Sequence, residues 1–276
     1  MKKSFVYFLL SMFVVGGYAQ SSKDTLLTVK SSKDTLLTVT RDTLEKKSKS
    51  LYIKFGNGDN DDEKESKPVS KVTFRFIVAR FDLGLSTYTD KGSYTLSAAN
   101  AFLERETWKS SNFGFDFFQM GYRFTDHFKI YASAGLDWNH MRLKQNITFQ
   151  KDKSSLTYIT DAVDYKKNRF SSRYLRIPLS FQFRTNDDKK GDKLNFVIGP
   201  EIGFLLNGKV KQVSNENGKD KSKDDYNFNP FRYGAFARIG YGGMGVYAKY
   251  YGNDVFADGQ GPADFRNLSF GLMFGF

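Results

Sequence analysis

Apolar and polar residues alternate along most of the chain from residue 72 onward. At its end, Leu268, Phe270, Leu272, Phe274 and Phe276 share one side of an extended chain, and small or polar residues share the other. A period of two is the pattern of a β-strand with two unlike faces. A strand that stays apolar to its last residue suits a transmembrane barrel, where one face meets lipid and the other meets the lumen.

The same alternation predicts eight strands. We place them at residues 72–86, 113–124, 128–138, 173–184, 194–206, 231–241, 244–251 and 266–276. The alternation slips out of phase near Val78 and again near Phe117. An extra residue in one strand of a pair produces such a slip, so we expect a β-bulge at each place.

Long and short connections alternate between these strands. The connections 125–127, 185–193 and 242–243 are short, whereas those that follow the first, third, fifth and seventh strands are longer. Outer-membrane barrels sort their loops in this way, with short turns in the periplasm. A soluble β-sandwich has no reason to do so. The fold class predicted is therefore all-β, an eight-stranded antiparallel up-and-down transmembrane β-barrel with both termini in the periplasm.

Charged residues occupy the predicted inward face of this barrel. A barrel of eight strands has a lumen that its own side chains can fill, so buried charges of both signs predict a packed charge network. A polar pathway through the lumen is the alternative. The network is predicted to comprise Arg80, Asp82, Lys129, Asp137, Arg176, Arg184, Glu201, Arg232, Arg238 and Lys249, with Asp116 and Arg123 added beside the bulges.

The N-terminal segment has the pattern of an export signal. A basic start precedes an apolar run over residues 5–15, and small residues stand at the −3 and −1 positions before Gln20. We expect a signal peptide over 1–19, cleaved before Gln20. The apolar run is too short to span a bilayer, which argues against an uncleaved anchor.

A tail follows the signal peptide. Residues 20–70 are polar and charged, and the nine-residue stretch SSKDTLLTV occurs in them twice. Such a segment cannot bury a core, so we expect a flexible periplasmic tail. The barrel domain then takes residues 71–276.

Composition limits the chemistry. The chain has no cysteine, which excludes disulfides, thiolate sites and an N-terminal lipid anchor on cysteine. Its net charge is +12 and 17% of its residues are aromatic. Basic residues gather in the predicted connections 139–172 and 207–230 rather than on a helix, so outer-membrane lipid, with its phosphate groups, is the expected partner and nucleic acid is not. Solubility of the loops is the alternative explanation of these basic residues.

The two histidines predict neither a metal site nor a cofactor. His127 and His140 fall at opposite ends of one predicted strand, so they cannot share a metal ion. His140 beside Ser154 or Ser172 would be the base of a lipid-modifying enzyme, but no spacing supports that pairing. An ordinary surface histidine is the preferred interpretation, and we expect no enzyme activity.

One stretch resembles a known family. Residues 174–179 read YLRIPL, and residues 199–203 read GPEIG before a lysine-bearing connection. Both resemble the PorT-like outer-membrane β-barrel family of Bacteroidota, which implies a Gram-negative outer membrane and insertion by the barrel-assembly machinery. The terminal strand, with Leu268 to Phe276, is then a candidate assembly signal. Arg176 stands where the family often has an acid, so a role for a carboxylate there does not carry over.

These observations predict a small integral barrel with a structural or interaction role. Some members of the resembled family are similar to components of a type IX secretion pathway, so an accessory role, with periplasmic or secretion partners bound by residues 20–70, is one alternative. A narrow channel and a lipid-modifying barrel enzyme are the others.

Overall fold

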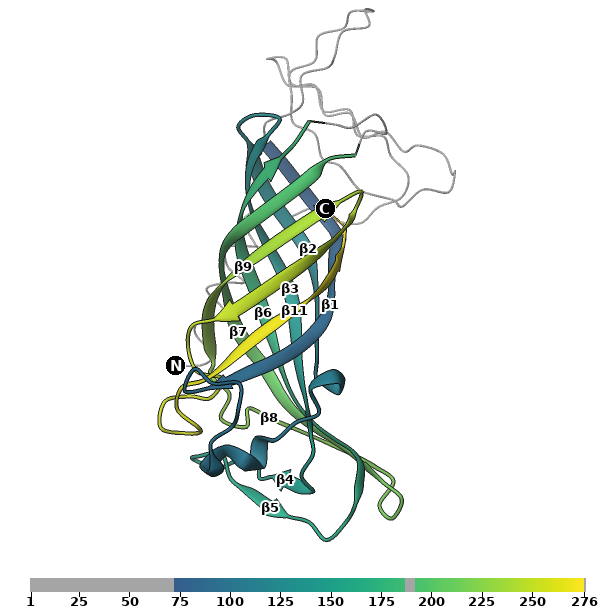
Figure 1. Ribbon diagram of the computed structural model, residues 1–276, viewed down its shortest axis with the longest axis vertical. Helices are drawn as coiled ribbons and strands as arrows, with labels where there is room; N and C mark the ends of the chain where they lie inside the picture. Colours follow the sequence, from purple (N-terminus) through teal and green to yellow (C-terminus); the bar gives the residue numbers. More distant parts are fainter. Residues whose placement is uncertain (1–71, 187–191, 276) are drawn as a thin grey trace, which may run out of the picture. The chain divides into compact units, whose positions relative to one another are not determined.

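The computed structural model describes residues 72–186 and 192–275, with only the backbone for 75–79, and all of them lie in one of the two units of the chain. Eight antiparallel strands form the barrel (Figure 1). They are β1 (Val72–Asp90), β2 (Ser111–Arg123), β3 (Phe128–Leu143), β6 (Tyr165–Arg184), β7 (Leu194–Ser214), β9 (Phe231–Tyr241), β10 (Met244–Tyr251) and β11 (Phe265–Phe274). The pairing of β6 with β7 closes the sheet, which confirms the predicted fold. The predicted signal peptide, tail and terminal Phe276 lie outside the described residues.

The first and last barrel strands pair with each other. β1 and β11 are in register from Phe81 opposite Phe274 to Asp90 opposite Phe265. Together with the β6–β7 pairing, this gives every barrel strand two neighbours. All backbone donors and acceptors of a strand can then bond within the ring, as a bilayer requires.

Both predicted bulges are present. The register between β1 and β2 shifts between Phe76 and Arg80. The register between β2 and β3 shifts between Asp116 and Phe118. Arg80 directly follows the first shift and Asp116 directly precedes the second, and both side chains are buried in the lumen.

The outward face carries an apolar belt between two aromatic girdles. In the terminal strand, Phe270 and Leu272 are 43% and 52% exposed, so this face is not part of a sealed core. Phe128, Phe183 and Phe196 lie side by side in one girdle, and Phe113 packs on Trp138 in the other. Eleven residues of β3 separate the two girdles, counted from Phe128 to Trp138, which is the length of strand that crosses a bilayer.

The two ends of the barrel differ. The connections β2–β3, β6–β7 and β9–β10 lie at one end, here called the short-turn end, where Gly242 and Gly243 both have positive φ and make a two-residue turn. The opposite, long-loop end carries further elements (Figure 1). These are η2 (Ala98–Leu103), η3 (Thr107–Lys109), β4 (Ile147–Phe149), β5 (Tyr158–Thr160) and β8 (Lys219–Asp224).

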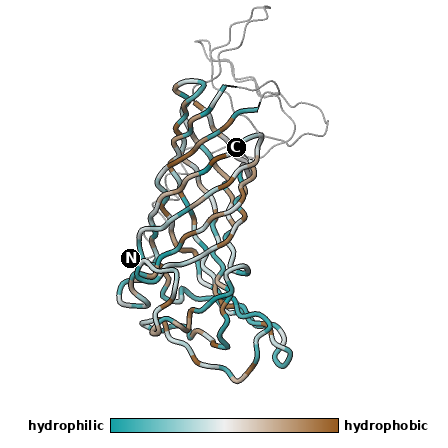
Figure 2. The backbone as a smooth tube through the Cα atoms, viewed as in Figure 1, coloured by the Kyte–Doolittle hydropathy of each residue, from teal (hydrophilic) through white to brown (hydrophobic). Residues whose placement is uncertain are grey.

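β3, β6 and β7 continue furthest beyond their predicted ends, toward the long-loop end of the barrel. β3 ends at Leu143 rather than at residue 138, β6 begins at Tyr165 rather than at 173, and β7 ends at Ser214 rather than at 206. Beyond the apolar belt, the outward-facing positions of β3, β6 and β7 carry charged residues. The sequence pattern there therefore predicted loops instead of strands. Their inward positions keep the alternation, as Phe170 and Val210 show. Figure 2 shows the hydropathy alternating along the barrel strands.

The interior of the long-loop end is apolar. The strand extensions turn Met141, Leu143, Phe170 and Val210 inward, and loop residues pack on them. We call this cluster the apolar plug; it comprises Tyr88, Leu103, Met141, Leu143, Ile147, Phe149, Phe170, Val210, Tyr226, Phe228, Phe256 and Phe265. Among the described residues, no helix is both long and apolar enough to cross a bilayer.

Candidate functional site

Arg176 is the centre of the charged lumen. Its guanidinium donates to Asp82 at 2.5 Å and to Asp116 at 2.8 Å, and it lies 3.6 Å from Asp137. Arg176 itself is 0% exposed. Its acidic partners belong to β1, β2 and β3, so a single side chain from β6 connects three other strands across the barrel. Arg176 and these three aspartates thus compensate one another's charges inside the protein, as buried charges require.

Lysine and arginine side chains from the far wall complete the network. Lys249 lies 2.7 Å from Asp82 and 3.2 Å from Asp137, and Arg232 lies 2.6 Å from Asp137. Arg80 binds Asp116 at 3.0 Å and donates to the hydroxyl of Tyr131. Sequence alternation placed these residues on one face, and the closed sheet brings them into contact.

Aromatic side chains fill the space between the charges. The guanidinium of Arg232 lies 4.0 Å from the ring centre of Tyr174 and 4.1 Å from that of Tyr251. The Tyr251 hydroxyl donates to Glu201 at 2.5 Å. Cation–π contacts to two rings therefore stabilise the Arg232 guanidinium in addition to its ion pair with Asp137.

Arg238 is the least satisfied member. Its three guanidinium nitrogens have no hydrogen-bond partner among the described residues, its nearest carboxylate oxygen is 3.9 Å away on Asp82, and it lies 4.1 Å from the ring of Phe236. Lys129 is also buried, and it lies 5.1 Å from the ring of Tyr131. At the short-turn end, Arg184 is half-buried and donates to Gln182 at 2.9 Å. Arg184 therefore stands apart from the ion pairs around Arg176.

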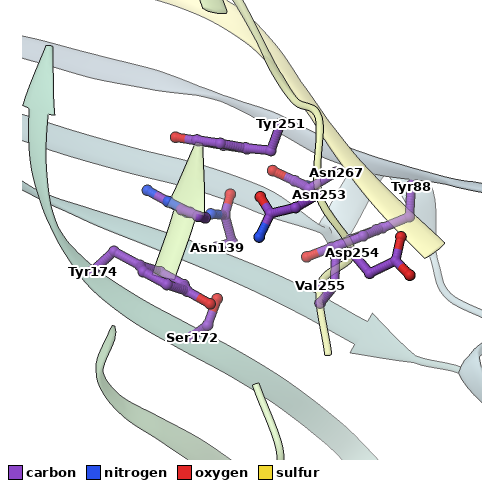
Figure 3. Close-up of a pocket in the computed structure, with 10 residues that line it drawn as sticks. Tyr88, Asn139, Ser172, Tyr174, Tyr251, Asn253, Asp254, Val255 and Asn267 are labelled. Atoms are coloured by element: carbon purple, nitrogen blue, oxygen red, sulfur yellow. The ribbon is translucent and has the colours of Figure 1, made fainter. Parts of the chain in front are cut away.

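A small cavity separates the network from the apolar plug. It has a volume of about 20 Å³, enough for one water-sized molecule, and Figure 3 shows Tyr88, Tyr174 and Tyr251 converging around it. Asn139 and Ser172 also line it. Beyond the cavity, Phe170 stacks on Phe149 at 4.2 Å and on Phe228 at 4.6 Å, so the lumen ends against packed rings.

The comparison with protein families agrees with this architecture. The family model described as outer membrane protein beta-barrel domain matches residues 73–253, more than half of the chain. This chain belongs to the outer membrane protein beta-barrel domain family. The solved structure of Ail, the attachment invasion locus protein of Yersinia pestis, is similar with a TM-score of 0.32 and 12% identity, over 74% of this chain and 95% of that chain. Among curated proteins, none matches.

Membership of the outer membrane protein beta-barrel domain family assigns the protein to the outer membrane. The apolar belt then faces lipid, and the predicted terminal strand lies in it as β11. Leu268, Phe270, Leu272 and Phe274 all lie on β11. Phe276, the last residue of the predicted assembly signal, is outside the described part of the chain.

His140 contacts a serine other than the two named for the enzyme alternative, Ser154 and Ser172. Its Nδ1 lies 2.9 Å from the hydroxyl of Ser171, on the outward face just beyond Trp138, whereas Ser172 faces the small cavity inside. Burial and the nearby cations Arg169 and Lys167 lower the pKa of His140 to about 4. Within residues 72–186 and 192–275, no three histidine or carboxylate side chains are placed so that they could hold a metal ion.

Sequence reasoning missed two features. The apolar plug was not predicted, because its loop residues come from four separate connections and have no common period. The outward basic rows on β6 and β7 were assigned to loops, although Lys167 and Arg169 are in β6 and Lys209 and Lys211 are in β7. Alternation of Asn168, Phe170 and Ser172 with these cations was the signal that could have revealed the strand.

Proposed function

We propose that this protein is a sealed, non-enzymatic outer-membrane barrel with a structural or interaction role. The observation that supports it is the closed interior: ion pairs around Arg176 fill the lumen at the belt, and the apolar plug fills it at the long-loop end. A barrel closed in this way anchors a folded head in the membrane. The head consists of the long-loop elements η2, η3, β4, β5 and β8.

Planar-bilayer recording tests the sealed lumen. The purified protein should pass no stepwise current. Arg238→Ala and Arg184→Ala should be equally silent, because neither removes the ion pairs of Arg176 or the plug. A steady conductance in the wild type that Arg238→Ala changes would show that the protein is a channel and would overturn the proposal.

We infer an interaction role from exposed aromatic residues on the head. Trp108, on η3, is 86% exposed, and Tyr94 is 65% exposed. Exposed tryptophan is a common anchor in protein interfaces. A photo-crosslinking amino acid at position 108 should yield adducts with protein in cells, and the same group at lipid-facing Ile239 should not. Protein adducts from neither position would leave only the structural role.

We further propose that the head lies outside the cell and both termini lie in the periplasm. The described chain begins and ends at the short-turn end, and long loops are outward in barrels of this kind. A signal peptide over 1–19, cleaved before Gln20, would deliver the chain. Because the protein has no cysteine, Lys151→Cys on the head and Asp126→Cys in the exposed β2–β3 turn are clean reporters. An impermeant maleimide should label only Lys151→Cys in intact cells.

Two partners follow from this placement. We propose that the barrel-assembly machinery recognises the terminal strand through Phe274 and Phe276, so deleting Phe276 should reduce the amount of folded barrel. A PorT-like role as a secretion accessory rests on the tail. Deleting residues 20–70 should leave secretion of cargo unchanged if the role is structural, and should abolish it if the protein is an accessory.

A lipid-modifying enzyme is the second candidate, and the His140–Ser171 contact favours it. A serine and a histidine at the lipid boundary could act as nucleophile and base. However, no carboxylate bonds to His140 among the described residues, and an imidazole with a pKa near 4 is a weak base. Ser171→Ala should leave the lipid profile of the outer membrane unchanged; a lost or new lipid species would establish the enzyme.

A further inference from the structure

Four cations form one row across the outward face at the long-loop end. In the strand register, Arg142 on β3 stands opposite Arg169 on β6, Arg169 stands opposite Lys211 on β7, and Lys211 stands opposite Lys221 on β8. The adjacent row, nearer the belt, runs through His140, Ser171, Lys209 and Lys223. Like charges directly opposite each other on neighbouring strands destabilise a sheet.

Carboxylates do not compensate these rows. Among the described residues, only Arg142 of the cations in the two rows has an acidic partner, Glu106 at 3.7 Å, and Glu106 also binds Lys109. The Nε atoms of Arg169 and Arg173 are buried without a hydrogen-bond partner. In β8, with the sequence KDKSKD, alternation puts Asp220 and Asp224 on the face opposite the lysines. Asp224 there accepts a hydrogen bond from the backbone of Asp152.

Burial and neighbouring cations lower the pKa values of two lysines in the row. Partial burial, with Lys167, Lys219 and Arg169 nearby, lowers the pKa of Lys211. Neighbouring Lys219, above all, lowers the pKa of Lys221. Lowered pKa values mean that the folded protein holds these positive charges at a cost. An anion bound at the rows would remove that cost.

The position of the rows indicates where the anion comes from. A hollow of about 350 Å³ lies between them and the belt, lined by Phe113, Trp138, His140, Arg169, Arg173 and Lys209, among others. Trp138 belongs to the aromatic girdle, and Arg173 lies 5.8 Å from its ring. Aromatic girdles mark the level of lipid head groups, so these cations face the head-group layer and not open solvent.

We propose that the two basic rows of β3, β6, β7 and β8 bind the phosphate groups of an outer-leaflet glycolipid, with its apolar chains on the belt below Trp138. The proposal rests on the orientation proposed above, which places the long-loop end at the outer leaflet. Arginine and lysine pairs that flank a phosphate form charge-assisted hydrogen bonds with several of its oxygens. The proposed structural role would then include specific binding of one class of lipid.

Trp138 is a built-in reporter of the site. The chain has two tryptophans, so Trp108→Phe leaves Trp138 alone. This single-tryptophan protein, folded in a neutral sugar detergent, is titrated with lipid A, with dephosphorylated lipid A and with inorganic phosphate. We expect a saturable change in Trp138 fluorescence with lipid A, and none with the other two at the same concentration. An equal response to dephosphorylated lipid A or to inorganic phosphate would overturn the proposal.

A matched pair of variants tests the residues. Arg169→Gln/Lys211→Gln should weaken lipid A binding about tenfold or more, since each basic residue near an anionic surface contributes a several-fold change in affinity. Lys151→Gln/Lys153→Gln removes the same charge from exposed loop positions and should bind like the parent. Equal weakening in both pairs would reduce the effect to net charge and contradict a site.

Two further measurements distinguish failure of the phosphate site from failure of the proposed orientation in the membrane. Arg169→Gln/Lys211→Gln should fold as well as the parent on a heat-modifiability gel, because it removes facing like charges. The detergent titration does not depend on orientation in the cell. Specific binding of lipid A together with periplasmic labelling of Lys151→Cys would retain the phosphate site but overturn its assignment to the outer leaflet.

Discussion

Arg176 Nη1 and Asp82 Oδ2 lie 2.5 Å apart, although 94 positions separate the two residues in the sequence. β6 and β1 are not neighbours in the sheet, since β3 and β2 stand between them. The pair therefore spans the lumen rather than following the wall. Because Asp116 and Asp137 share the same guanidinium, the pair also fixes how these strands are staggered.

Removing the guanidinium should destabilise the barrel. Arg176→Met keeps the length of the side chain but leaves Asp82 and Asp116 without their closest cation, and breaking a buried ion pair costs about 3–5 kcal/mol. We expect a lower temperature for conversion of the folded to the unfolded band on a heat-modifiability gel. Arg266→Met is the control, because Arg266 is partly exposed and its ion pairs are superficial. Equal conversion temperatures for both variants would refute the central role of Arg176.

Gly84 should tolerate no larger residue. It stands opposite Gly271 in the closing pair, and a Cβ atom at Gly84 would collide with the backbone oxygen of Phe270 and lie 2.5 Å from the Tyr247 hydroxyl, closer than atoms can approach. Gly84→Val should therefore yield no heat-modifiable barrel. Ala248→Val, on the outward face of β10, adds comparable bulk toward lipid and should assemble normally. Normal assembly of both variants would mean that Tyr247 does not cross above Gly84.

The apolar plug should be separable from the barrel. Phe170 stacks on Phe149 and Phe228, and truncation of a buried phenylalanine costs about 3–5 kcal/mol. In Phe170→Ala, added protease should cut the connection 144–164 faster, while the barrel keeps its heat-modifiable band. Ile239→Ala, which faces lipid, should leave the cutting rate unchanged. Loss of the whole barrel in Phe170→Ala would show that head and barrel unfold as one unit.

The stability of the long-loop end should fall in mild acid. The pKa of His140 is lowered to about 4 in the fold, so between that value and the unfolded value near 6.5 the unfolded chain binds more protons. The contribution of neutral His140 is therefore complete above about pH 6.5 and is lost as the pH falls, by about 2 kcal/mol at pH 5. The cations around it are Arg142 on β3, Lys167, Arg169 and Arg173 on β6, Lys209 on β7 and Lys223 on β8. Asp137, on the lumen side of β3, acts in the opposite direction and raises the pKa of His140.

Urea unfolding at pH 7.5 and pH 5 measures this dependence. His140→Asn has no proton to gain, so its midpoint should change less between the two pH values than that of the parent. Bound lipid A should reduce the change in the parent, because phosphate favours the protonated imidazole. Identical pH dependence in parent and variant would assign the effect to other groups.

The alternation of apolar and polar residues with a period of two is a local property of each strand, and so it can be recognised directly in the sequence. It specified which side of each strand faces lipid, where the bulges near Val78 and Phe117 fall, and that eight strands connect in an up-and-down order. Inward placement of Asp82, Asp137 and Arg176 followed from parity alone. These predictions need no knowledge of how one strand is staggered against the next.

Contacts between strands depend on that stagger, which closure of the barrel decides. Whether Arg176 reaches Asp82, whether Arg142 stands opposite Arg169, and which serine meets His140 all change with a shift of register. The apolar plug depends further on loops from four connections that meet only when the barrel is closed. Sequence by itself thus determined the fold, the faces and the class of residue in the lumen, whereas only the tertiary structure decided the partners, because pairing across a closed sheet is not encoded in any single strand.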